Sequence, residues 1–231
     1  MNFLLVAATL FEIRPFLDKL PLLEKQSEKL SRYHFKNSAI DVLITGVGMI
    51  PTAYLLGKQL AMQRYDLVIN AGIAGTFNKL LSLGSVVNVV EDCVPELGAE
   101  DGERFLSVFE LGLTDPDALP YTAGKLVNDI LEHESVINLD LIRKLPRVTG
   151  ITSNTIRGNA ASIARIRQMA LADLESMEGA SFFYACLSEN VPCLQIRAIS
   201  NFVEERDKSR WKLDLALKNL NRVLWESVTS H

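Results

Sequence analysis

Six apolar runs of strand length recur along the chain, separated by stretches with helical periodicity. Several runs are continuously apolar rather than alternating, which is typical of strands covered on both faces. The stretches between them carry apolar residues at three- and four-residue spacing, as the core-facing side of a helix does. This alternation predicts an α/β fold with a central sheet between helices. The predicted strands are residues 3–8, 40–45, 67–71, 85–90, 148–152 and 192–199, and the predicted helices are residues 51–63, 160–170, 178–187 and 211–228.

The length of 231 residues fits one large α/β domain or two small ones. We find no internal repeat, low-complexity tract or linker, so we predict a single domain over residues 1–231. The segment 92–123 is rich in glycine, proline and acidic residues, and it is predicted to form loops with a short strand or two.

The composition indicates which kinds of binding partner and cofactor this protein is expected to have. The formal net charge of −4 argues against a nucleic-acid or membrane-surface binder, which usually carries clustered Lys and Arg. The first residues lack a basic segment, Glu12 and Arg14 interrupt their apolar run, and no run is long enough to span a membrane, so we expect a cytoplasmic protein. The three cysteines and three histidines show no metal-ligand or triad spacing, and we predict neither a metal nor a cofactor.

Polar side chains follow most of the predicted strands. In an open α/β sheet, ligands bind just beyond the carboxyl ends of the strands, so these positions form the candidate site. Each also has an ordinary structural explanation: Glu12 and Glu178 as first-turn helix carboxylates, and Asn201 as a helix cap or turn residue. The segments are A-A-T-L-F-E ending at Glu12, T-G-V-G-M at 45–49, N-A-G-I-A-G-T-F at 70–77, S-N-T-I-R-G-N at 153–159, S-M-E-G at 176–179, and R-A-I-S-N at 197–201, whose Arg197 has the acids Glu204, Glu205 and Asp207 close by.

Two glycine motifs differ in what they indicate. In T-G-V-G-M, Gly46 and Gly48 are followed by Pro51 where a dinucleotide fingerprint needs a third glycine, so a tight strand-to-helix turn is favoured over a cofactor site. In N-A-G-I-A-G, small residues allow the backbone either to approach a ligand or to pack closely on a helix.

The order of all these segments resembles the purine nucleoside phosphorylase and nucleosidase superfamily over nearly the whole chain. S-M-E-G-A and R-A-I-S-N in this order are its most specific motifs. The resemblance implies a three-layer αβα sandwich with a central mixed β-sheet. Within the superfamily the chain is most similar to futalosine hydrolases, through E-L-G-A-E-D-G at 96–102 and I-S-N-F-V-E-E-R-D-K-S-R-W at 199–211. That family cleaves futalosine to hypoxanthine and dehypoxanthine futalosine in menaquinone biosynthesis.

The same resemblance implies roles for individual residues. Glu12 would be the general base for water, and Arg197 would hold that water. Glu178 would accept hydrogen bonds from the ribose 2′- and 3′-hydroxyls, and its charge would favour a cationic transition state. Asn201 stands where the adenine nucleosidases have Asp; an amide cannot donate a full proton, but it offers a donor and an acceptor that match a 6-oxopurine. Further substrate-binding residues implied by the family are Thr9, Gly72, Ile73, Ile156, Ser176, Met177 and Phe202.

Several alternatives stay open at this point. Phosphorylases of the superfamily carry R-x-G-S or R-x-G-T where this chain has Asn70-Ala71-Gly72-Ile73, which favours water over phosphate as the nucleophile, although Arg157 and Arg197 remain as cations. Inosine or methylthioadenosine could be the substrate, or the chain could be an inert purine-nucleoside-binding protein; a nicotinamide-dependent oxidoreductase fits less well. The family forms homodimers or larger assemblies, so we expect a homo-oligomer. The candidates for holding the carboxyphenyl end of futalosine are Arg104, Arg157 and Arg206.

Overall fold

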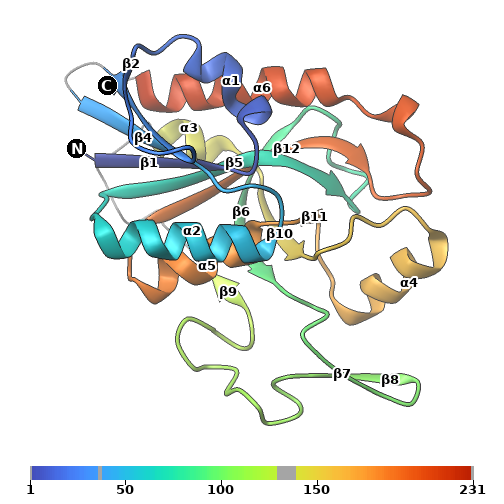
Figure 1. Ribbon diagram of the computed structural model, residues 1–231. Coiled ribbons are helices and arrows are strands. Elements are labelled where there is room, and N and C mark those ends of the chain that lie inside the picture. The colour runs from blue at the N-terminus through green and yellow to red at the C-terminus, as the bar shows by residue number, and fades with distance from the viewer. Residues whose placement is uncertain (1, 36–37, 129–138, 230–231) are drawn as a thin grey trace.

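The computed structural model describes residues 2–35, 38–128 and 139–229 (Figure 1). Its centre is one mixed sheet with the strand order β11-β10-β6-β12-β5-β1-β4-β3-β2, and β9 pairs with β6 beside this path. The strands are β1 (Asn2–Ala7), β2 (Leu22–Lys25), β3 (Leu30–Phe35), β4 (Ser38–Ile44), β5 (Leu67–Thr76), β6 (Val86–Cys93), β9 (Leu126–Val127), β10 (Arg147–Thr152), β11 (Leu174–Ser176) and β12 (Cys193–Phe202).

Helices cover both faces of this sheet, which gives the three layers expected from the sequence. One apolar core lies under α1 (Leu10–Leu17), α3 (Leu139–Lys144) and α6 (Leu213–Thr229). The other lies under α2 (Met49–Met62) and α5 (Gly179–Ser188), and α4 (Ala160–Met169) packs with a smaller cluster at the edge. Figure 1 shows α1 and α6 on one side of the strands and α2 and α5 on the other.

Part of the sheet closes on itself. The short strand β11 pairs in parallel with β10 and antiparallel with β5, so β5, β12, β6, β10 and β11 form a ring. In this ring Gly75 of β5 has Glu175 of β11 on one side and Asn201 of β12 on the other. The closure therefore brings polar residues from distant segments together at one end of the sheet.

The predicted strands are all present, and some of their ends differ. The strand predicted at 85–90 continues to Cys93, because the polar residue Asp92 is buried within it rather than starting a loop. The antiparallel strands β2 and β3 were not predicted, because β2 is fully exposed and β3 largely half-buried, and neither has an apolar run. The helix predicted from 211 begins at Leu213, after a 3₁₀ turn at Lys208–Arg210.

The expected excursion after β6 contains a two-stranded hairpin, β7 (Gly98–Asp101) and β8 (Arg104–Ser107). Figure 1 shows it projecting away from the central sheet. Among the described residues, no helix has both the length and the apolar character needed to cross a membrane.

Candidate functional site

A cavity of about 310 Å³ opens where the carboxyl ends of β1, β5, β11 and β12 meet. Most of the residues singled out from the sequence line it: Thr9, Glu12, Ile73, Ile156, Ser176, Met177, Glu178 and Asn201. Ala74 and Gly75 of the N-A-G-I-A-G motif, whose small residues were expected to allow close approach of the backbone, also line it. The remaining lining residues were not singled out from the sequence: Ala8, Phe11, Val47, Thr155, Glu175, Ser200, Trp211 and Leu213.

Glu12 is buried at the start of α1 and points at β5. Its Oε2 accepts hydrogen bonds from the backbone N–H and the hydroxyl of Thr9, both at 3.0 Å, and its Oε1 accepts from the backbone N–H of Ile73 at 3.1 Å. Thr9 and Glu12 thus form a capping box at the helix N-terminus. Burial raises the pKa of Glu12 above its ordinary value of 4.5, the Ile73 bond and the charge of Arg197 oppose this, and the charge of Glu178 adds to it. The structural and the catalytic explanation of Glu12 therefore coexist in one side chain.

Glu178 is the N-cap residue of α5 and is also buried. Its side chain does not cap its own helix; Oε1 instead accepts the backbone N–H of Gly48 at 2.9 Å. Gly48 has a φ of 103°, which L side chains rarely adopt, so the T-G-V-G-M turn presents this N–H to the carboxylate. The turn thereby holds Glu178 against the cavity.

Arg197 is only 2% exposed and lies beneath the cavity in a polar network. Its Nε donates to Gln195 Oε1 at 3.1 Å, and its Nη2 donates to Asn70 Oδ1. A Cβ at Gly72 would lie 2.4 Å from Arg197 Nη1 and 2.8 Å from Glu12 Oε1, so the glycine is what allows these groups to approach the backbone. The alternative in which Arg197 pairs with a nearby acid is not what the structure shows: Glu204, one of those acids, pairs with Lys79 and Arg210 instead.

The network continues from Arg197 to a fully buried carboxylate. Asp92 accepts from Gln195 Nε2 at 3.2 Å and from Thr152 Oγ1 at 2.9 Å. Thr152 Oγ1 in turn accepts the backbone N–H of Ala180 at 2.7 Å, in the first turn of α5. One chain of hydrogen bonds therefore ties the arginine under Glu12 to the helix that starts at Glu178.

Asn201 also lines the cavity, with its amide beside Gly75. Its Oδ1 accepts from Ser200 Oγ at 2.7 Å, and its Nδ2 donates to the carbonyl of Phe202 at 3.0 Å. Phe202 is not among the residues that line the cavity; Lys79 Nζ lies 4.0 Å from the centre of its ring. The predicted contact of Phe202 with a base therefore receives no support from the geometry.

Comparison with known proteins supports the family suggested by these motifs. The sequence profile described as the phosphorylase superfamily matches residues 2–229. The chain belongs to the phosphorylase superfamily. A futalosine hydrolase from Streptomyces coelicolor is 33% identical over 78% of this chain and 74% of its own, and one from Thermus thermophilus is 29% identical over 82% and 81%. The solved structure of a Helicobacter pylori futalosine hydrolase shares the fold at a TM-score of 0.77, with 14% identity over 98% of this chain and 96% of that chain.

Two features separate this chain from the phosphate-using pattern of the superfamily. Asn70, where those enzymes would have arginine, is buried; its Nδ2 donates to Val6 O at 3.2 Å and its Oδ1 accepts from Arg197. Arg157 does not line the cavity, because Glu175 and Glu96 bind it, at 3.4 Å and 2.7 Å. Both groups are thus occupied within the protein.

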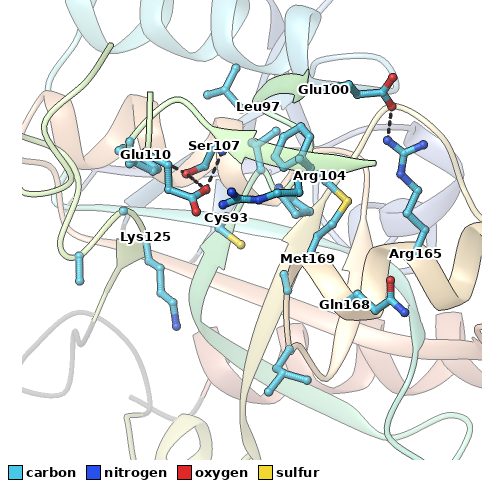
Figure 2. A pocket seen from close by; sticks show the side chains of 18 of the residues that line it. Cys93, Leu97, Glu100, Arg104, Ser107, Glu110, Lys125, Arg165, Gln168 and Met169 are labelled. Carbon is cyan, nitrogen blue, oxygen red and sulfur yellow. Dashed lines mark hydrogen bonds and ion pairs between the residues drawn. The ribbon is translucent and has the colours of Figure 1, made fainter. Parts of the chain in front are cut away.

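A second hollow of about 930 Å³ lies between the β7–β8 hairpin and α4 (Figure 2). Arg104, one of the three arginines proposed for the carboxyphenyl group, lines this hollow and not the 310 Å³ cavity. Two other cations of the hollow are paired with acids: Arg165 with Glu100, and Lys125 with Glu91 at 2.6 Å. The third candidate cation, Arg206, sits over the ring of Trp211 at 5.6 Å. None of the three candidate arginines lines the 310 Å³ cavity, so the geometry assigns no holder for a carboxyphenyl group.

Asp92 makes the stability of the protein depend on pH. Burial raises its pKa from 3.8 to about 6, which means that the fold favours the protonated form. The stabilisation is complete below pH 3.8 and is lost as pH rises toward 6. Urea unfolding should show that the free energy of unfolding of Asp92→Asn, relative to that of wild type, rises by up to roughly 3 kcal/mol from acidic to neutral pH. If the difference between variant and wild type does not change with pH, the prediction is wrong. A part of the difference that is the same at every pH reflects the altered bond to Gln195.

Proposed function

We propose that this protein is an N-ribosyl hydrolase that cleaves futalosine to hypoxanthine and dehypoxanthine futalosine, a step of menaquinone biosynthesis. The observation that carries the proposal is the convergence of Glu12, Glu178 and Asn201 on one cavity. The futalosine hydrolases among the relatives supply the substrate.

The chemistry needs three groups, and the cavity offers all of them. Cleaving an N-ribosidic bond develops positive charge on the ribose, as in glycoside hydrolysis, and sends the bonding electron pair to the base. Glu178 accepts hydrogen bonds from the ribose hydroxyls and stabilises the cationic sugar. Glu12 takes a proton from the attacking water, and Arg197 orders the site from beneath. The base leaves with the electron pair and takes a proton from solvent, which balances the proton that Glu12 gains. Asn201 binds the departing base.

Water as the nucleophile is supported by the internal bonds of Asn70 and Arg157. Phosphate would need free cationic and hydroxyl groups. At the third-strand motif, this chain has an amide that already binds Arg197 and a backbone N–H, that of Ile73, which already binds Glu12. The arrangement fits hydrolysis better than phosphorolysis.

Asn201 is expected to favour a 6-oxopurine over adenine. A base that leaves with its imidazole nitrogen protonated presents an N–H donor and an oxo acceptor, which the amide can match with its acceptor and donor. Adenine places an amino donor where the oxo group should be, and unpaired buried groups are penalised. In steady-state assays, Asn201→Asp should lose activity on futalosine and gain activity on adenine nucleosides. No gain on adenine nucleosides together with no loss on futalosine would contradict this role.

We further propose that the protein acts in the cytoplasm as a homo-oligomer. Cys93, Cys186 and Cys193 are free thiols, which suits a reducing compartment. Val47, which lines the cavity, and Ile50 and Tyr54, in the first half of α2, are 54%, 80% and 66% exposed. An apolar surface of this kind suits a neighbouring chain. Light scattering should give a multiple of 25.7 kDa; a mass of 25.7 kDa would contradict the oligomer.

Product analysis tests the function directly. Purified protein is incubated with futalosine, inosine and methylthioadenosine, each with and without phosphate, and the bases are separated by chromatography. Hypoxanthine released from futalosine alone, independently of phosphate, is the expected result. Phosphate-dependent release from inosine would indicate a phosphorylase. Adenine from methylthioadenosine would contradict the role of Asn201, and no release from any substrate would favour an inert binding protein.

A further inference from the structure

Glu175, Gly75 and Asn201 form a row across three adjacent strands. Gly75 of β5 is the register partner of Glu175 on β11 and of Asn201 on β12. Residues directly opposite each other on neighbouring strands project to the same face, and neighbouring strands lie about 4.8 Å apart. The carboxylate and the amide therefore stand on either side of a position without a side chain, roughly 10 Å apart at the backbone.

The glycine keeps the space between the two polar groups open. A Cβ at Gly75 would lie 3.1 Å from Asn201 Nδ2 and 3.0 Å from a methyl of Val203, so even alanine would crowd the gap. Gly75, Glu175 and Asn201 all line the 310 Å³ cavity. A flat ring could lie in this gap with hydrogen bonds of about 2.9 Å to a side chain at each end.

Glu175 lines the cavity and retains capacity to accept hydrogen bonds. It is buried, and its bonds come from Arg157, whose backbone N–H donates to Oε1 at 3.2 Å and whose Nη1 donates to Oε2 at 3.4 Å. Each carboxylate oxygen can accept two bonds, so one site on each oxygen remains. Arg157 also keeps a positive charge beside the carboxylate, which offsets the cost of burying it.

We propose that Glu175 is a specificity-determining residue for the base: its carboxylate accepts the ring N–H that a 6-oxopurine carries on its six-membered ring and that adenine lacks. The inference rests on the proposed function and deepens it, since it names a second contact for the same base. Asn201 binds the imidazole side and Glu175 the pyrimidine side. Adenine would place a ring lone pair against the carboxylate, and two acceptors facing each other in a buried site repel.

Equilibrium binding of the free bases tests Glu175 without relying on turnover. Isothermal titration calorimetry gives the dissociation constants of hypoxanthine and adenine for wild type and for Glu175→Gln. The glutamine oxygen can still accept one of the two bonds from Arg157, while its NH₂ replaces the other oxygen and offers the base a donor in place of an acceptor. The expected result is a shift of the hypoxanthine-to-adenine preference by about tenfold or more toward adenine. Equal weakening of both bases, an unchanged preference, or no hypoxanthine binding to wild type would overturn the proposal.

The matched control is Glu96→Gln. Glu96 binds the same arginine, through Nη2 at 2.7 Å, but does not line the cavity, so its substitution should leave the base preference unchanged. A shift of equal size in Glu96→Gln would assign the effect to Arg157 and overturn the role of Glu175.

A second measurement needs no variant, in case Glu175→Gln does not fold. 1-Methylhypoxanthine keeps the oxo group and replaces the ring hydrogen by methyl; it should bind wild type about tenfold or more weaker than hypoxanthine. Equal binding would overturn the proposal. The failure of this inference can be told apart from the failure of the proposed function. If wild type releases no hypoxanthine from futalosine, the proposed function is wrong. If the enzyme is active but Glu175→Gln leaves the base preference unchanged, only the role of Glu175 is wrong.

Discussion

Replacing Glu12 by glutamine should lower kcat on futalosine by about 10²–10⁴-fold, the usual contribution of a general base. The substitution keeps the size of the side chain and an oxygen for the N–H of Ile73, which lies 3.1 Å from Oε1. It removes the ability to take a proton from water. The measurement is steady-state kinetics with hypoxanthine release as the readout, and a kcat within a few-fold of wild type would contradict the assignment.

The chain contains a close structural control for this substitution. Ser107 and Glu110 repeat the geometry of Thr9 and Glu12: Glu110 Oε2 accepts from the backbone N–H of Ser107 at 2.8 Å and from its hydroxyl at 2.9 Å. Glu110 is exposed and does not line the 310 Å³ cavity. Glu110→Gln should therefore leave kcat unchanged. If Glu12 were only a capping residue, both variants would lose at most about 0.5–2 kcal/mol of stability and keep their activity.

The pH profile gives Glu12 a second signature. Because burial raises its pKa above 4.5, the base is lost by protonation at a higher pH than for an ordinary glutamate. Activity should therefore fall as pH drops through that raised value, and kcat/KM should show an acid limb above pH 4.5. Glu12→Gln should lack this limb in its residual activity. An acid limb that persists unchanged in the variant would belong to another group.

The central strands could be predicted because burial on two faces leaves long apolar runs, and four of the helices because they carry apolar residues at helical spacing. These are β1, β4, β5, β6, β10 and β12, and α2, α4, α5 and α6. The strands β2 and β3 escaped prediction for the opposite reason, since an exposed edge hairpin needs no such run. The three-residue strand β11 is too short to show a period. Its place follows from pairing with β10 and β5, which are distant in sequence, and local patterns carry no information about such pairing.

The candidate site was predictable where a polar residue interrupts a strand end within a motif, as at Glu12, Glu178 and Asn201. Glu175 was not predicted as a site residue, although it directly precedes S-M-E. Only its pairing with Gly75 in the folded sheet shows that it lies at the cavity. Trp211 and Leu213 escaped because they reach the cavity from the segment after β12, and apolar residues at a helix start are ordinarily core. The structural alternatives raised for Arg197 failed, since Gln195 and Asn70 rather than the later acids bind it.

Replacing Glu178 by glutamine should lower kcat by about 10²–10³-fold, comparable with the loss of one group that stabilises developing charge in a transition state. The amide can still accept the N–H of Gly48, which lies 2.9 Å from Oε1, so the turn and the start of α5 should remain in place. What disappears is the negative charge beside the cationic ribose and one of the two acceptors for its hydroxyls. Glu189→Gln, at the exposed C-terminal end of the same helix, is the matched control and should leave kcat unchanged.

The acid limb of the pH profile separates this role from a simple helix-end effect. The charge of Glu178 contributes to the raised pKa of Glu12, so removing it should lower that pKa and move the acid limb of kcat/KM to lower pH. A helix-end carboxylate without contact with the reaction would instead cost about 0.3–1 kcal/mol of unfolding free energy on substitution and leave both kcat and the limb in place. The two carboxylates are therefore coupled through the cavity, and a slower enzyme with a limb displaced toward acid is the result that places both of them around the same substrate.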